Sequence, residues 1–162
     1  MEHEIGKAFL LQARVHLNDD FMPKIARCLE ELSEEDVWWR AHETNNSVGN
    51  LLLHLAGNVR QWIVSGFGGM PDSRQRSLEF SERNAIPTKI IWSTLQDAVR
   101  EASQILESFP VGRLLETRKI QGFDKTALQA IFHVVEHFAL HTGQIIYITK
   151  LREGRDLKFY NL

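Results

Sequence analysis

The sequence predicts an all-α protein, a four-helix bundle with long crossover connections between its helices. Four long segments carry apolar residues three and four positions apart, which is the spacing of one face of an α-helix. Strand signal is confined to one short stretch, and the chain has no internal repeat. With 162 residues, 43% of them hydrophobic and 25% charged, we expect a single domain over residues 1–162.

The first predicted helix covers residues 5–32, where apolar residues recur at helical spacing. Pro23 interrupts this pattern, since proline lacks the amide hydrogen that a helix interior needs. It predicts a kink or a restart near Asp19 and Asp20, whose side chains would cap the new turn. Cys28 lies on the apolar face, so we expect it to pack in the core rather than to react.

A connector over residues 33–46 separates the first helix from the second. Ser33 followed three residues later by Asp36 indicates one short capped turn within it. The second long helix begins near Ser47 and runs to about Gly66, where a cluster of glycines must end it.

The middle of the chain is predicted to be irregular, then helical, then extended. Residues 71–84 are charged and lack a clear period. A third helix starts at Thr88 and ends before Pro110. Residues 111–124 contain the signal of a short strand or hairpin, closed by a turn over 122–124.

The fourth predicted helix covers residues 126–153, with Gly154 as its stop. Between Lys125 and Lys150 its only charged residue is Glu136, which superficially resembles a membrane span. Its histidines and glutamines argue against that reading. We therefore expect a helix that other parts of the protein surround on most sides.

Composition excludes several classes of function. A formal net charge of −2 without a basic block disfavours nucleic acid as a partner. The amino terminus carries acids ahead of its apolar residues, so it does not resemble a signal peptide, and no segment predicts a membrane partner. A single cysteine suits a reducing compartment. We expect a cytoplasmic protein.

Three histidines in the last helix form one row and predict a metal site. Residues four apart are rotated by about 40° and rise about 6 Å, so His137 and His141 can hold one ion. His133 extends the row, but it lies about 12 Å along the axis from His141, too far for both to join His137 in one shell. Spacing alone leaves two candidate pairs.

The second helix offers a matching polar stripe without charge. Its members are Ser47, Asn50, His54, Asn58 and Gln61. A solvent-facing stripe would normally carry lysine or glutamate, so this one predicts a polar cavity that faces the histidine row inside the bundle. Imidazole is the commonest transition-metal ligand, which makes His54 a third candidate.

Segment 46–58, which contains His54, and segment 137–145, which contains the histidine pair, resemble the DinB superfamily of metal-binding helical bundles. Further similarity to an uncharacterised bacterial branch lies in Arg74, Arg76, Glu79 and Phe80 and in the tail 157–160. The resemblance implies a DinB-like four-helix bundle. It also implies His54, His137 and His141 as the metal ligands, with His133 outside the coordination shell.

The resemblance favours a metal-dependent, thiol-dependent S-transferase, with a small-molecule thiol and an electrophile as substrates. A metal-dependent hydrolase, or a non-catalytic stress-response protein with a structural metal, are the alternatives. Zinc or nickel is favoured, while iron and manganese also suit the ligands. His137 is followed by Phe138 rather than glutamate, so the zincin protease motif is absent. No catalytic residue is assigned.

Around the ligands, Asn50, Asn58 and Gln144 are expected to orient the imidazoles through hydrogen bonds. Glu136 points about 100° away from His137 and is a poor fourth ligand, which leaves one coordination position open.

Two surface features predict partners less directly. Arg74, Arg76 and Glu79 could bind carboxylates or phosphates of a substrate, although solvated ion pairs at the bundle edge are the more common role of such residues. The charge-poor last helix and the aromatic tail, Phe159 and Tyr160, predict a homodimer. Adjacent tryptophans at 38 and 39 cannot both face inward, so one is left for a pocket or a subunit contact.

Overall fold

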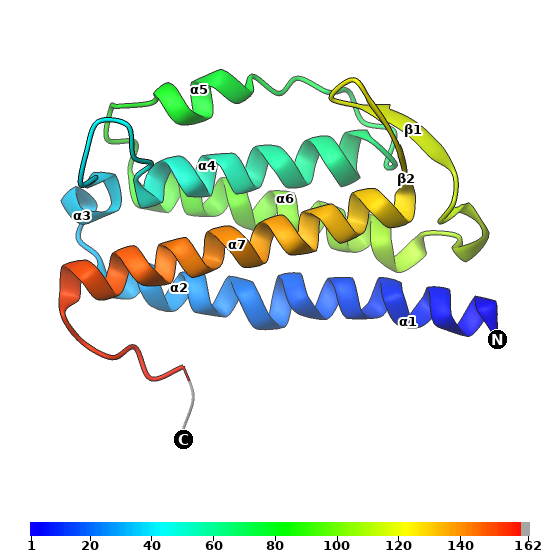
Figure 1. The fold of residues 1–162 in the computed structure, drawn as a ribbon, viewed down its shortest axis with the longest axis horizontal. Helices are drawn as coiled ribbons and strands as arrows, with labels where there is room; N and C mark the ends of the chain where they lie inside the picture. Colours follow the sequence, from blue (N-terminus) through cyan, green and yellow to red (C-terminus); the bar gives the residue numbers. More distant parts are fainter. Residues whose placement is uncertain (160–162) are drawn as a thin grey trace.

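The computed structural model describes residues 1–159, and the protein is mostly helical over that range (Figure 1). Four long helical segments run side by side (Figure 1). They are α1 (Glu2–Val15) continued by η1 (His16–Phe21) and α2 (Met22–Glu31), α4 (Val48–Val59) continued by η2 (Arg60–Ser65), α6 (Thr88–Ser108), and α7 (Ala127–Glu153). Shorter elements are α3 (Glu34–Trp38), α5 (Arg76–Ser81), η3 (Val111–Arg113), β1 (Thr117–Ile120) and β2 (Phe123–Thr126). Tyr160 of the predicted aromatic tail lies outside the described residues.

Near Asp19 and Asp20, where a kink or a restart was predicted, the α-helical pattern is interrupted and resumes at Met22, but without a kink or a new side-chain cap. The π-helical segment η1 ends two residues before Pro23, and the Met22 amide donates to the Leu17 carbonyl. The wider turn accommodates the residue that cannot donate, so α1 and α2 form one continuous rod (Figure 1). Asp19 and Asp20 lie within η1, and no side chain caps α2.

The ends of α3, α4 and α7 follow capping residues. Ser33 accepts a hydrogen bond from the Asp36 amide at the start of α3. Ser47 and Asn50 form a reciprocal capping box at the start of α4. At the far end, Gly154 closes α7 in the left-handed conformation, with φ of 65°, which glycine adopts without strain. The predicted ends of the second and fourth helices are confirmed.

The short hairpin lies where the sequence placed it, with a different turn. β1 and β2 pair antiparallel, and Ile120 is opposite Phe123. The turn is therefore Gln121–Gly122, both with positive φ, and Phe123 already belongs to β2. The predicted turn over 122–124 was wrong by about two residues, because glycine marks the turn without showing which side of it continues the strand.

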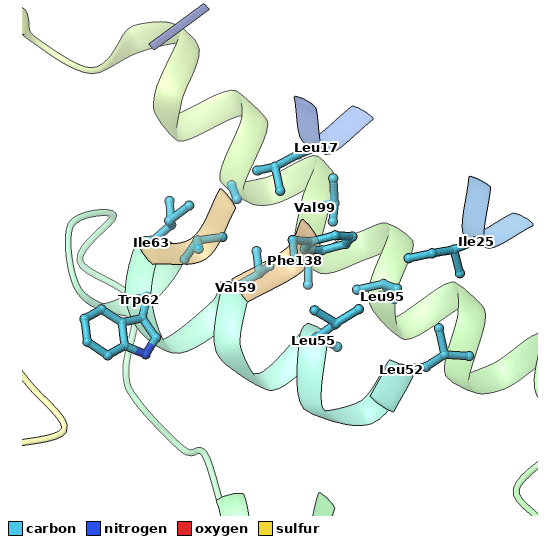
Figure 2. Packing of buried hydrophobic residues seen from close by; sticks show 14 of the residues in the cluster. Leu17, Ile25, Leu52, Leu55, Val59, Trp62, Ile63, Leu95, Val99 and Phe138 are labelled. Atoms are coloured by element: carbon cyan, nitrogen blue, oxygen red, sulfur yellow. The ribbon is translucent and has the colours of Figure 1, made fainter. Parts of the chain in front are cut away.

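The core fills the space between the four long segments (Figure 2). Leu17 and Ile25 come from the first segment, Leu55 from α4, Leu95 from α6, and Phe138 from α7, as Figure 2 shows. Cys28 is fully buried in this core, and burial raises the pKa of its thiol, so the packing role is confirmed. None of the helices in residues 1–159 combines the length and apolar character that crossing a bilayer requires.

The last helix is less enclosed than its lack of charge suggested. Phe132, Leu140 and Tyr147 on α7 are 59%, 60% and 69% exposed. The expectation that protein surrounds this helix on most sides was therefore wrong. This face stays apolar although it is open to solvent.

Candidate metal centre

Three histidines converge where α4 and α7 pack against each other. His54 on α4 is buried, and His137 and His141 occupy successive turns of α7. Nε2 of His137 lies 3.0 Å from Nε2 of His54 and 3.1 Å from Nε2 of His141. One nitrogen from each ring lies within 4.8 Å of the other two, close enough to hold one metal ion.

Two of the three rings are anchored through the opposite nitrogen. Nδ1 of His54 lies 2.8 Å from a carboxylate oxygen of Glu79, and Nδ1 of His141 lies 2.7 Å from the side-chain oxygen of Gln144. Because both oxygens only accept, each Nδ1 carries the proton and donates it. The lone pairs of the two Nε2 atoms therefore face the centre, the tautomer that metal ligation needs.

Burial keeps the rings of His137 and His141 uncharged. Burial, together with the neighbouring His141 and His54, lowers the pKa of His137 to about 3. Burial also lowers the pKa of His141, against the hydrogen bond with Gln144. Neutral imidazole is the ligand form of histidine, so these two ligands are ready for a cation at neutral pH without releasing protons.

The donor set fits a transition metal. Zinc–nitrogen bonds of about 2.0–2.1 Å place two ligands of a tetrahedral ion about 3.4 Å apart, slightly more than the 3.0 and 3.1 Å between the Nε2 atoms. Hydrogen bonds among the rings cannot satisfy all three nitrogens, since two present fixed lone pairs and His137 has one proton at most. A cation at their centre satisfies all three.

A buried ion pair supports His54 from outside. Arg74 donates to both carboxylate oxygens of Glu79, Nε at 2.7 Å and Nη2 at 2.8 Å. Both side chains are nearly enclosed, with exposures of 4% and 11%. Burial alone would raise the pKa of Glu79, but the hydrogen bonds from Arg74 and His54 outweigh it and hold that pKa below the ordinary value.

Gly57 makes room for this ion pair on α4. A Cβ atom at position 57 would collide with Oε1 of Glu79 and would lie 2.8 Å from Nε of Arg74. The sequence analysis did not assign Glu79 to the site, because it lies 25 residues from His54 in a segment that looked irregular. A glycine beside the polar stripe of the second helix was the available signal of a close approach.

The sequence matches the model of one protein family over residues 4–162, a family described as "Protein of unknown function (DUF1572)". The chain belongs to the DUF1572 family. Neither the search of curated proteins nor the search of solved structures found a match.

The DUF1572 chain places the other expected residues around the three histidines at different distances. Gln144 contacts His141 directly. The Asn50 amide donates to the carbonyls of Glu79 and Glu82, so it reaches His54 only through α5. Asn58 contacts His133 at 3.3 Å, and neither belongs to the group of three.

Three charged residues of segment 71–84 either form a buried ion pair beside His54 or stack on an aromatic ring near it. This segment contains the helix α5, so the prediction of an irregular stretch was wrong there. Arg74 and Glu79 are buried against His54 rather than solvated. Arg76 lies over the ring of Phe80 at 4.9 Å, and that ring in turn covers His54 with 4.5 Å between centroids.

Glu136 on α7 is exposed and lies outside the group of three histidines.

Proposed function

We propose that this DUF1572 protein is a DinB-like four-helix bundle with long crossover connections that binds one divalent transition metal through His54, His137 and His141. The observation that carries the proposal is the convergence of three Nε2 atoms, two of them with the opposite nitrogen anchored by an acceptor. The family match over 4–162 supports one domain across residues 1–162. We place that domain in the cytoplasm.

The residues around the three histidines carry no net negative charge that would neutralise a bound divalent ion. The three rings are neutral ligands, and the negative charge of Glu79 is offset by Arg74 at 2.7 Å. A divalent ion would therefore keep a local charge of about +2, which favours an anionic ligand at the remaining position. Among the described residues no fourth histidine, cysteine, aspartate or glutamate joins the group.

The activity that we propose is thiol-dependent S-transfer to a small electrophile. A bound zinc or nickel ion, or iron or manganese in their place, would lower the pKa of a coordinating thiol and so supply a nucleophile at neutral pH. Glu79 and Gln144 hold the rings of His54 and His141 in orientation for this role. The ring of Phe80 covers His54 and keeps water from that side.

Cobalt substitution tests the proposal directly. Adding a cellular thiol to the cobalt protein should produce sulfur-to-metal charge-transfer absorption, and the band should be absent from His54→Ala. The same thiol should be consumed with an electrophile such as 1-chloro-2,4-dinitrobenzene in the zinc or nickel protein. If no thiol changes the cobalt spectrum and no thiol-dependent conversion occurs, transferase chemistry is excluded in favour of hydrolysis or a structural metal.

We also propose that the protein forms a homodimer. Phe123 on β2 and Leu128 and Phe132 on α7 are exposed apolar side chains on neighbouring elements. Burying such side chains against a second copy would remove them from water, at about 25 cal/mol for each Å² of apolar area.

A further inference from the structure

A groove with the character of a ligand pocket lies beside the three histidines and has no role in the function proposed above. It runs between the connector 39–46 and the exposed face of α7, and its volume is about 720 Å³. Volumes of 300–1,000 Å³ are typical of sites for small organic molecules. The groove is therefore large enough for a substrate rather than a single ion.

One wall of the groove is aromatic and apolar. Tyr147 and Leu140 of α7 line it and are 69% and 60% exposed, and Trp39 of the connector lines it as well. Trp39 is held in place from outside, because the Arg152 guanidinium stacks over its ring at 4.8 Å and is itself paired with Asp36 at 2.6 Å. A flat apolar molecule could pack against these rings.

The groove has a single permanent charge, the guanidinium of Arg40. None of the other described residues that line it is an arginine, lysine, aspartate or glutamate. Nη2 of Arg40 donates to the Trp38 carbonyl at 3.3 Å, whereas Nη1 is buried and has no hydrogen-bond partner among the described residues. Glu43, the acid nearest in sequence, attracts Arg40 only electrostatically, and its closest cation is Arg83 at 4.0 Å. Nη1 is therefore a charged donor that the fold leaves unpaired.

Gln144 joins the groove to the three histidines. Its side chain lines the groove and accepts from Nδ1 of His141 at 2.7 Å. A molecule bound in the groove would consequently be separated from the ring of one proposed metal ligand, His141, by the side chain of Gln144.

We propose that this groove binds a small organic anion, with its flat apolar part against Trp39 and Tyr147 and its carboxylate on Arg40. Turning the Arg40 side chain toward the groove gives Nη1 the partner that it lacks and allows a two-point contact with a carboxylate. In the transferase proposed above, this anion would be the electrophilic substrate, and that assignment rests on the proposed function. Binding of the anion in the groove does not depend on it.

Two probes of nearly equal shape test the proposal, 1-naphthaleneacetate and its uncharged amide, 1-naphthaleneacetamide. Calorimetric titrations of the full chain, metal-free and metal-loaded, should show the acid binding about 10-fold or more tightly than the amide, because a hydrogen bond to a charged group is strong. Arg40→Gln should remove that preference and Arg40→Lys should keep part of it. Arg100→Gln, an exposed arginine on α6, should leave the preference unchanged.

A second readout locates the probe. The acid should quench tryptophan fluorescence in the wild type, and Trp39→Phe should remove most of the change while the other three tryptophans remain. Equal affinities for acid and amide, an unchanged preference in Arg40→Gln, or no binding of either probe would each overturn the proposal. Binding in the metal-free protein without any thiol effect on the cobalt spectrum would reject the transferase and keep the groove.

Discussion

Gly57 is the residue on which the support of His54 depends. Its lack of a side chain lets the Arg74–Glu79 ion pair lie against α4, where Glu79 holds the proton of His54. Acceptors that orient a histidine ligand typically change metal affinity by 10- to 100-fold. The position of one hydrogen-bond acceptor is thus set by a glycine on a different element.

Gly57→Ala should therefore weaken metal binding by about 10-fold or more, because the new Cβ displaces Glu79 from His54. Gly143→Ala is the matched control: position 143 lies two residues from His141 on α7, and a Cβ there meets no atom within 4 Å. That control should keep full affinity and gain a little helix stability. Competition with a chromogenic chelator measures both, and equal affinities in the two variants would contradict this role of Gly57.

A second prediction for single residues concerns how much metal each histidine variant binds. The wild type should bind about one equivalent of metal after reconstitution, whereas His54→Ala and His137→Ala should bind far less. His133→Ala should lose affinity only modestly, because His133 contacts Asn58 and lies outside the group of three. Elemental analysis of the reconstituted proteins measures the metal content of each variant. Loss of metal in His133→Ala together with retention in His141→Ala would instead select His133 and His137.

Among the elements, α5 determines where Glu79 lies. It lies over α4 on the outside of the molecule (Figure 1), and its C-terminal half is tied to Asn50 through the carbonyls of Glu79 and Glu82. Asn50→Ala should release α5 and lower metal affinity several-fold, in addition to weakening the cap of α4 by about 1 kcal/mol.

Gln129→Ala separates the two effects, because Gln129 belongs to the corresponding capping box of α7 and does not touch α5. Asn50→Ala should lose more stability in urea than Gln129→Ala, because Asn50 is buried and also donates to two carbonyls. Only Asn50→Ala should lose metal affinity and show faster amide exchange in α5. Equal metal affinities would mean that α5 stays in place without Asn50.

Periodicity made the long helices predictable and left α5 undetected. The second and fourth helices carry twelve or more residues of one period and end in capping residues, Ser47 and Gly154, that act within a few residues. Helix α5 has six residues, too few to display a period. Gln144 was predictable since it lies three residues from His141 on the same helix, whereas Glu79 reaches His54 only through the tertiary fold.

For the whole molecule, the neutral histidines predict how the stability of the metal-free protein depends on pH. The pKa of His137 falls from 6.5 to about 3 on folding because the ring is buried. Below pH 6.5 the unfolded chain binds a proton there that the folded protein does not, so the free energy of unfolding should decrease as the pH falls toward 3.

Urea unfolding of metal-free protein at pH 7, 6 and 5 measures this effect. We expect a loss of on the order of 1 kcal/mol per pH unit below about 6, and a shallower loss in His137→Gln, which has no titrating ring. A stability that stays constant or rises between pH 7 and 5 would show that the folded protein takes up the proton.

The exposed apolar face of α7 predicts the assembly of the whole molecule. Phe132 is 59% exposed, and together with Leu128 and Phe123 it offers an apolar surface to a second copy of the chain. In sedimentation velocity at micromolar concentrations the wild type should be a dimer, and Phe132→Glu should be a monomer, because the interface would bury an unpaired carboxylate. Leu11→Glu is the matched control, since Leu11 on α1 is 58% exposed and lies outside this surface. It should remain a dimer, and a wild type that stays monomeric throughout the concentration range would refute the dimer.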